Sequence, residues 1–240
     1  MFSRYICNTA LLLDKAIKAK KDILFEGAQG TFLDVDFGTY PFVTSSSTTA
    51  GGACTGTGVS PDKIDKIIGV AKAYTTRVGE GPFPTEFSPD FSSFMRDKGR
   101  EFGATTGRPR RCGWFDSVAV GEAVMLNGIT ELAIMKMDVL EGLRSVKICT
   151  AYIYQGKRFR DFPYDAQAQE KAKPVYIEMP GWDKTIKNSW HYKDLHPNAK
   201  AYLNKLSGLL NVKISMVSVG SSREETIFIP PSQNTRASPG

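Results

Sequence analysis

The chain has 240 residues, of which 41% are hydrophobic and 11% aromatic, so it can bury a large core and is not globally disordered. It contains no apolar run of about 18 residues or more, so we expect a soluble, cytoplasmic protein with no membrane partner. The formal net charge of +6 favours an anionic partner. Charge alone does not distinguish nucleic acid from phosphorylated metabolites.

The cysteines and histidines show no spacing typical of a metal site or a disulfide framework. The four cysteines lie far apart without a C-x-x-C pair, and the chain has only two histidines. We therefore expect reduced cysteines that fill small apolar spaces, and no metal ligands.

The N-terminal segment 1–21 predicts an amphipathic helix capped by Asn8 or Thr9, and not a signal peptide. Asp14 and a lysine-rich continuation stand where a signal peptide needs small residues for cleavage. The lysines at positions 15, 18, 20 and 21 are interpreted as a solvated face of this helix.

A strand, a loop and a second helix are predicted next. The residues ILFE at 23–26 have strand character and lead into a glycine turn. The stretch 38–61 is rich in Gly, Thr and Ser, but a flexible linker would not need the apolar residues at 40–43, so we expect a packed, ligand-facing loop. Residues 62–74 place apolar side chains at 64, 67, 68 and 71, the spacing of one buried helix face.

The rest of the chain alternates helices with strands. The predicted elements are a loop over 79–87, a helix over 115–128, a buried parallel strand over 131–136, a hairpin around Gln155 and Gly156, a helix over 197–210 and a strand over 212–220. The helix over 115–128 has Asp116 or Ser117 as its N-cap and ends at Asn127 and Gly128.

This alternation predicts an α/β fold with a mainly parallel central sheet flanked by helices, together with an additional antiparallel hairpin. We expect one domain over 1–230 and a disordered tail over 231–240.

The segment 103–111, GATTGRPRR, has the composition of an anion-binding loop. Arginine side chains bind carboxylates and phosphates in a bidentate manner, and glycines let backbone N–H groups approach an anion closely. A basic surface turn is the alternative interpretation.

A second candidate site is Lys136-Met137-Asp138, directly after the apolar strand. Open α/β sheets bind ligands at the carboxyl ends of their strands. A carboxylate there can accept both the N1–H and the 2-amino group of guanine, a donor pair that adenine lacks. Solvated charges at the end of a strand are the alternative.

Amide and hydroxyl groups on two loops form a third candidate, made of Gln29 and Thr44. They suit a polar small molecule, or they satisfy backbone groups of their own loops. The nearby run GGACTGTG lacks the G-K-[ST] ending of a P-loop and gives no nucleotide fingerprint.

Taken in order, four segments resemble the signatures of adenylosuccinate synthetases: FEGAQGTFLDVDFGTYPFVTSSSTTAGG, AYTTRVGEGPFPTE, EFGATTGRPRRCGWFDSVAV and KMDVLEGL. The resemblance covers about residues 20–230. It implies a P-loop-NTPase-like fold, truncated here, and a homodimeric ligase of purine (AMP) biosynthesis. That ligase joins IMP and L-aspartate through 6-phosphoryl-IMP, with GTP as co-substrate and Mg²⁺ as cofactor.

The matching motifs imply three sets of binding residues. IMP would contact Gln29, Thr44 and Arg108. Aspartate would contact Ala104, Thr105, Thr106, Gly107 and Arg108. GTP would contact Arg110, Lys136, Met137, Asp138, Ser218, Val219 and Gly220, with Lys136 to Asp138 holding the guanine base.

The chain also departs from the family pattern. The turn at 219–224 reads VGSSRE where the family usually has Thr-Gly-Pro-acidic-Arg, and Pro109 interrupts a run of arginines. The Gly-Asp-Glu-Gly-Lys-Gly loop with the catalytic aspartate and magnesium ligand, the Gly-His segment with the catalytic histidine, the phosphate loop and the arginine lent to the neighbouring subunit have no counterpart here. No residue is therefore assigned as catalytic or as a metal ligand.

Two hypotheses follow for the function. In the first, the chain is an incomplete, inactive or weakly active piece of an adenylosuccinate synthetase that needs a complementary N-terminal piece or a dimer partner. In the second, it is a non-catalytic guanine-nucleotide/IMP-binding or partner-binding module. A nucleic-acid-binding protein is disfavoured, because aromatic residues are not interleaved with the basic ones.

Overall fold

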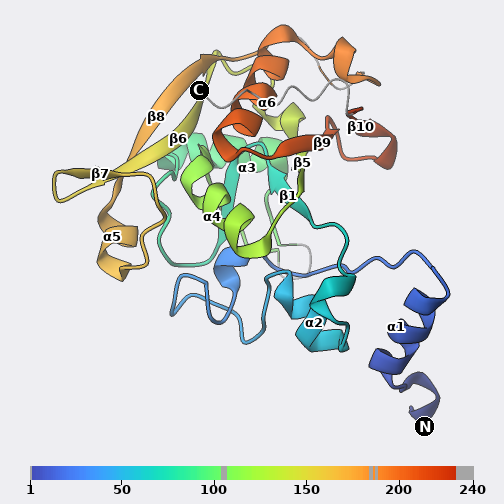
Figure 1. Ribbon diagram of the computed structural model, residues 1–240. Coiled ribbons are helices and arrows are strands. Elements are labelled where there is room, and N and C mark those ends of the chain that lie inside the picture. The colour runs from blue at the N-terminus through green and yellow to red at the C-terminus, as the bar shows by residue number, and fades with distance from the viewer. Residues whose placement is uncertain (1, 104–106, 184–185, 187–188, 231–240) are drawn as a thin grey trace. The chain divides into compact units, whose positions relative to one another are not determined.

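The computed structural model describes residues 2–103, 107–183, 186 and 189–230. The chain forms two compact units, Met1–Ile67 with Leu126–Gly128, and Ile68–Met125 with Ile129–Gly240 (Figure 1). Each unit is described by itself. The predicted disordered tail at 231–240 lies outside the described residues.

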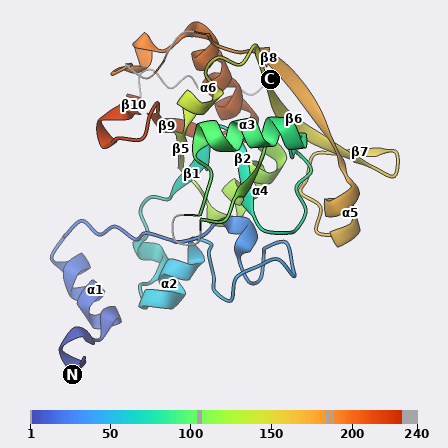
Figure 2. The same cartoon turned by 180° about the vertical axis from the view of Figure 1, so that it is seen from behind.

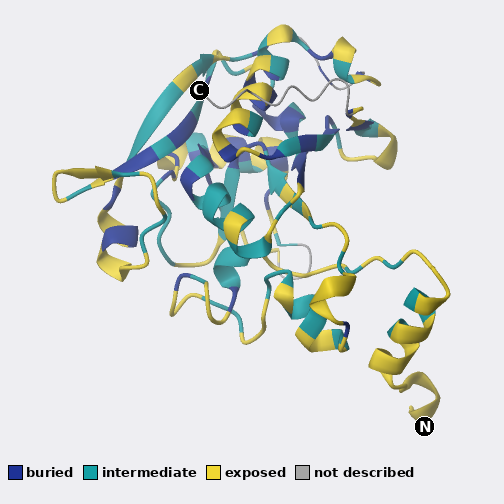
Figure 3. Cartoon of the chain, viewed as in Figure 1, coloured by how far each residue is buried: buried dark blue, intermediate teal, exposed yellow. Residues whose placement is uncertain are grey.

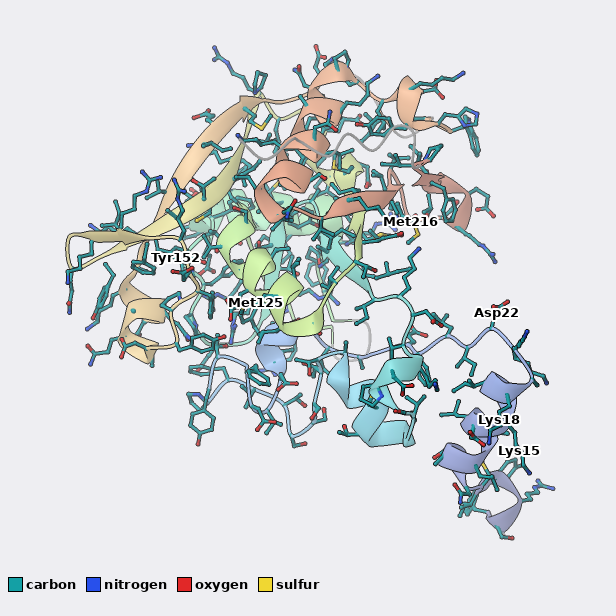
Figure 4. The ribbon with its side chains drawn as sticks, viewed as in Figure 1. Lys15, Lys18, Asp22, Met125, Tyr152 and Met216 are labelled. Carbon is teal, nitrogen blue, oxygen red and sulfur yellow. The ribbon has the colours of Figure 1, made fainter. Side chains whose placement is uncertain are left out.

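The first unit contains short helices joined by long loops. They are 3-10 helix η1 (Ser3–Tyr5), α1 (Thr9–Lys18), η2 (Thr31–Leu33), α2 (Gly51–Thr57) and η3 (Pro61–Lys63). The side chain of Asn8 accepts a hydrogen bond of 3.1 Å from the N–H of Leu11, which confirms the predicted cap of α1. No residue of α1 is buried, and Lys15 and Lys18 project from it as a solvated face (Figure 4).

The glycine-rich stretch 38–61 is held in place by a buried carboxylate. Asp34 is 1% exposed, and its two oxygens accept N–H groups of Asp36, Phe37, Thr48 and Thr49 at 2.6–3.1 Å. Burial would raise the pKa of Asp34, but these four donors together lower it. Of the apolar residues expected to anchor this stretch, Tyr40 is 77% exposed, whereas Val43 is half-buried and lies against Gly38. That the loop faces a ligand stays a prediction.

Two predictions for 23–26 and 62–74 are wrong. Residues 23–26 form no strand, and Leu24 is 89% exposed. A strand needs a hydrogen-bonded neighbour, and no described residue pairs with this segment. Residues 62–74 contain the end of η3 and strand β1 (Ile68–Lys72) in place of a helix. Parallel pairing of β1 with a neighbouring strand outweighs the helical spacing.

The second unit holds the sheets. The strands are β1, β2 (Thr75–Val78), β3 (Arg110–Gly113), β4 (Phe115–Asp116), β5 (Glu131–Met135), β6 (Ser145–Tyr154), β7 (Lys157–Phe159), β8 (Lys173–Pro180), β9 (Lys213–Ser218) and β10 (Thr226–Phe228). The first sheet has the order β1-β5-β9-β10, parallel except for the β9/β10 pair. A second sheet has two strands, β2 and β3. A third sheet has four strands, in which β4, β7 and β8 each pair with β6. The predicted α/β class with a mainly parallel sheet is confirmed.

Helices pack on these sheets. They are α3 (Pro89–Gly99), α4 (Ser117–Asn127), α5 (Ala166–Lys171) and α6 (Pro197–Leu210), with 3-10 helices η4 (Met137–Leu140), η5 (Tyr192–Asp194) and η6 (Arg223–Glu225). Helix α6 packs on β8 and β9, and α3, best seen in Figure 2, packs on β3. The apolar core includes Leu206 of α6, Ile134 of β5 and Val217 of β9. Figure 3 shows the buried residues of the chain in dark blue.

Three local predictions are confirmed in this unit. The carboxylate of Asp116 accepts the N–H groups of Val118 and Ala119 at the start of α4. The β6/β7 hairpin turns at Gln155 and Gly156, whose φ angles of 50° and 75° suit a tight two-residue loop. Helix α6 has the predicted bounds. None of the helices in the described part of the chain is long and apolar enough to cross a membrane.

Candidate functional site

The carboxyl ends of β5 and β9 bring together two of the predicted GTP-binding segments. The strands are parallel neighbours, with Ile134 opposite Val217. Residues 136–138 follow β5 directly, and the turn at 218–220 begins at the last residue of β9. Two segments about 80 residues apart in sequence therefore share one edge of the sheet, where open α/β sheets bind ligands.

The turn after β5 has an unusual backbone and an unpaired carboxylate oxygen. Lys136 has a φ of 62°, in the left-handed region that residues with a Cβ seldom adopt. Met137 is fully buried and anchors η4. Oδ1 of Asp138 is buried without a hydrogen-bond partner among the described residues. Burial raises the pKa of Asp138 above its usual value, and Glu225 and Glu141 add to that rise, whereas a hydrogen bond from its own backbone N–H and the charge of Lys136 oppose it.

The turn after β9 is closed by its own hydrogen bonds. The hydroxyl of Ser218 donates to the carbonyl of Gly220 at 2.6 Å, and the N–H of Val219 donates to the carbonyl of Glu225 at 2.9 Å. A Cβ on Gly220 would lie 2.1 Å from Cδ of Glu225, so a larger residue here would displace that side chain, which accepts the N–H of Ser222. The turn is thus rigid, although the sequence departs here from the family pattern.

A buried carboxylate, Glu101, gathers three cations beside these turns. Its side chain is 0% exposed. Oε2 accepts from Nζ of Lys72 and Nη1 of Arg110, each at 2.8 Å. Oε1 accepts from Nζ of Lys136 at 2.9 Å and from the hydroxyl of Tyr74. We call Glu101, Lys72, Tyr74, Arg110 and Lys136 the Glu101 cluster.

The Glu101 cluster is both rigid and positively charged. Burial would raise the pKa of Glu101, but the hydrogen bonds from Lys72, Tyr74 and Arg110 lower it to about 2. The carboxylate is therefore ionised at neutral pH and leaves a formal excess of two positive charges, because three cations face one anion. The cation side chains keep 24% to 32% of their surface exposed, so the cluster can attract an anion from solvent.

Sequence reasoning placed Arg110 and Lys136 at the site but missed Glu101, Lys72 and Tyr74. Glu101 opens the segment EFGATTGRPRR, and a single acidic residue before so many cations was an available signal. Lys72 is the last residue of β1, and Tyr74 follows shortly after it. Because a helix was predicted over 62–74, neither residue was expected at the end of a strand.

The predicted aspartate-binding loop is closed at its base. Phe102 and Pro109 form an isolated bridge, and the N–H of Gly103 donates to the carbonyl of Arg108 at 2.8 Å. Gly107 has a φ of 63° in open space, and Arg108 is exposed. Ala104, Thr105 and Thr106 lie outside the described residues.

The three residues predicted to contact IMP are divided between the two units. Gln29 and Thr44 belong to the first unit, and Arg108 belongs to the second. Gln29 is exposed with a φ of 61°, and the N–H of Thr44 donates to the carbonyl of Leu33 at 2.7 Å. Over the described ranges, no three His, Cys, Asp or Glu side chains are grouped to hold a metal ion.

Comparisons with known proteins show the family to which the chain is similar. The family model described as adenylosuccinate synthetase matches residues 1–227. The adenylosuccinate synthetase of Geobacter metallireducens is 55% identical over 226 residues, which are 94% of this chain and 53% of that protein. The one from Synechococcus sp. is 54% identical over 94% of this chain and 50% of its own length. The chain thus spans about half the length of the curated relatives it matches.

Solved structures give the same fold. The structure of fully ligated adenylosuccinate synthetase from Plasmodium falciparum superposes with a TM-score of 0.93 at 36% identity, over 95% of this chain and 55% of that one. A cyanophage S-2L succinoaminodeoxyadenylate synthetase, bound to dGMP and dATP, gives a TM-score of 0.55 at 18% identity over 95% of this chain and 51% of that one, which supports the fold alone.

Proposed function

This chain belongs to the adenylosuccinate synthetase family, and we propose that it carries the guanine-nucleotide and aspartate sites of the GTP-dependent ligase that joins IMP to L-aspartate. In the proposed reaction, GTP phosphorylates O6 of IMP, and the amine of aspartate then displaces that phosphate to give adenylosuccinate. Such phosphoryl transfer depends on positioning and on neutralisation of charge.

The observation that carries the proposal is the buried Oδ1 of Asp138, at the edge shared by β5 and β9, which no other described residue contacts by a hydrogen bond. A buried acceptor without a donor is costly in a folded protein, and it is expected where a ligand supplies the donor. Guanine offers N1–H and N2–H side by side, which match the two oxygens of one carboxylate. Adenine offers no such pair.

The remaining residues would act around that contact. Ser218, Val219 and Gly220 would border the base through their rigid turn, and Arg110 would face the phosphates from the Glu101 cluster. Gly107 and Arg108, with the residues at 104–106, would hold the aspartate carboxylates. Gln29 and Thr44, together with Arg108, would contact IMP.

We assign no catalytic acid, base or metal ligand to this chain. Magnesium would neutralise phosphate charge in the complete reaction, but the described residues offer no group of acidic ligands for it, and no step here depends on it. The chain alone should therefore show little turnover, and a complementary N-terminal piece or a dimer partner would supply the missing groups. An assay of GTP- and aspartate-dependent adenylosuccinate formation tests this, and robust activity of the chain alone would contradict it.

The second candidate is a non-catalytic guanine-nucleotide/IMP-binding module. The favouring observation is that the predicted base-reading residues lie within one compact unit of this chain. Both candidates require GDP binding. They differ when an N-terminal piece from a relative is added, because only the first predicts restored synthesis of adenylosuccinate.

Binding specificity tests the base assignment directly. Calorimetry should detect GDP but not ADP. Asp138→Asn should weaken GDP binding roughly 10- to 100-fold and improve binding of xanthosine diphosphate, because an asparagine N–H can donate to the 2-oxo group of xanthine. Asp97→Asn, on the exposed side of α3, is the matched control and should change neither. Unchanged GDP affinity in a folded Asp138→Asn variant would refute the assignment.

A further inference from the structure

Glu101 joins three separate parts of the second unit at one point. Lys72 ends β1, Arg110 begins β3, and Lys136 follows β5. The backbone of Glu101 takes part as well, since its carbonyl accepts the N–H of Arg110 at 2.9 Å. A single carboxylate therefore binds the guanidinium of Arg110 and the ammonium groups of two lysines, which lie on or next to three different strands.

The Lys136 ammonium is held by a second acceptor that also depends on this region. Its Nζ donates to the carbonyl of Gly99, at the end of α3, at 2.7 Å. A Cβ on Gly99 would lie 2.5 Å from the hydroxyl oxygen of Tyr74, so α3, Tyr74 and Glu101 are packed without spare room. Loss of the Glu101 carboxylate would take one acceptor from Lys136, which keeps the carbonyl of Gly99, and would remove the ion pair of Arg110.

We propose that Glu101 is a positioning residue for the nucleotide site: it aligns Arg110 toward the phosphates and holds Lys136 and the attached Asp138 turn at the base. The inference rests on the proposed function and deepens it. The Glu101 side chain is fully buried, so a bound nucleotide would contact the cations and not this carboxylate. It acts by setting the distance between a phosphate-binding cation and a base-reading turn that lie on different strands.

Charge supports this role over a purely structural one. A buried carboxylate paired with one cation would leave no excess charge, whereas Glu101 pairs with three cations and leaves a formal excess of two positive charges partly exposed. That excess would be repulsive without the carboxylate and suits a polyphosphate when the carboxylate is present.

The test compares GDP binding by the 240-residue chain with that of two variants. Glu101→Gln keeps the shape of the side chain but removes its charge, and it should weaken GDP binding roughly 10- to 100-fold. Glu131→Gln is the matched control, because Glu131 is also a buried carboxylate that pairs with a lysine, Lys213, at the opposite end of β5. It should stay within about twofold of wild type.

A double-mutant cycle separates positioning from mere stability. If Glu101 acts through Arg110, the loss of GDP affinity caused by Glu101→Gln should be at least about threefold smaller in a protein that also carries Arg110→Met. If Glu101→Gln fails to fold, Tyr74→Phe decides the question. It removes one donor to Glu101 and should weaken GDP binding about threefold in a folded protein.

The outcomes are distinguishable. If the wild-type chain binds no GDP, the proposed function and the inference both fall. If the wild type binds GDP and folded Glu101→Gln binds equally well, or if the cycle is additive, the inference alone is overturned. If Glu101→Gln is unfolded and Tyr74→Phe binds GDP as wild type does, the inference is again overturned.

Discussion

Asp116 is a buried carboxyl whose ionisation should destabilise the fold near neutral pH. It is 3% exposed, caps α4 through Val118 and Ala119, and accepts a hydrogen bond of 2.6 Å from the hydroxyl of Tyr152 on β6. Burial raises the pKa of Asp116 to about 6, against the opposing effect of these donors. Asp116→Asn removes the titration and keeps the shape of the cap.

The direction in which pH changes the free energy of unfolding depends on whether the folded or the unfolded state binds the proton of Asp116 more tightly. The folded state holds the proton up to about pH 6, whereas the unfolded chain releases it near 3.8. The contribution is therefore fully present below about pH 3.8 and is lost as the pH rises through 6. Over the whole range this loss is about 3 kcal/mol. Between about pH 5 and 7.5 it is about 1.4 kcal/mol, because the rest is already lost below about pH 5, where the unfolded chain has released the proton.

Urea unfolding at both pH values measures the effect. Relative to Asp116→Asn, wild type should gain about 1.4 kcal/mol in free energy of unfolding when the pH is lowered from about 7.5 to about 5. Other titrating groups cancel in this difference. Asp165→Asn, at the exposed N-cap of α5, is the control and should differ from wild type equally at both pH values. Parallel curves for wild type and Asp116→Asn would refute the reasoning.

Two further predictions concern backbone conformation and loop packing. Arg100 ends α3 with a φ of 48° and is exposed, so Arg100→Gly should raise the free energy of unfolding by about 1 kcal/mol, as urea unfolding would reveal; a loss of stability would contradict this. Asp34→Asn would place an amide N–H₂ group opposite backbone N–H donors. It should therefore lower the local free energy of unfolding by about 2 kcal/mol and speed amide hydrogen exchange over 44–57. The control variant Asp36→Asn changes an exposed residue and should have neither effect. Equal exchange rates in both variants would count against the role of Asp34.

The elements that could be predicted from sequence are those whose signals are local. Helix α6 begins with a proline, and its buried residues recur at helical spacing up to Leu210. The β6/β7 hairpin needs only a Gln-Gly turn between two strand-forming runs. The cap of α4 by Asp116 is likewise a short-range contact. In each case, the interaction that fixes the element joins residues close in sequence.

The errors arose where distant residues decide the structure. The segment around β1 has helical spacing, but Gly69 lies against Ile129 and Leu132, where a Cβ would be 2.6 Å from Cδ1 of Ile129. This close approach and the parallel pairing with β5 favour a strand, and neither can be read from 62–74 alone. The Glu101 cluster was missed for the same reason, since Lys72, Glu101 and Lys136 meet only after the sheet has formed.

The two carboxylates beside Lys136 have opposite pKa shifts: against the effect of burial, hydrogen bonds from Lys72, Tyr74 and Arg110 lower the pKa of Glu101, whereas burial raises the pKa of Asp138. Nζ of Lys136 is committed to Glu101 and to the carbonyl of Gly99. Among the described residues, Oδ1 of Asp138 has no hydrogen-bond partner. If Lys136 instead donated to Asp138, the Asp138 carboxylate would have a hydrogen-bond donor from within the protein. The commitment of Lys136 to Glu101 thus leaves Asp138 open to a ligand with adjacent N–H donors, which is what the proposed guanine contact requires.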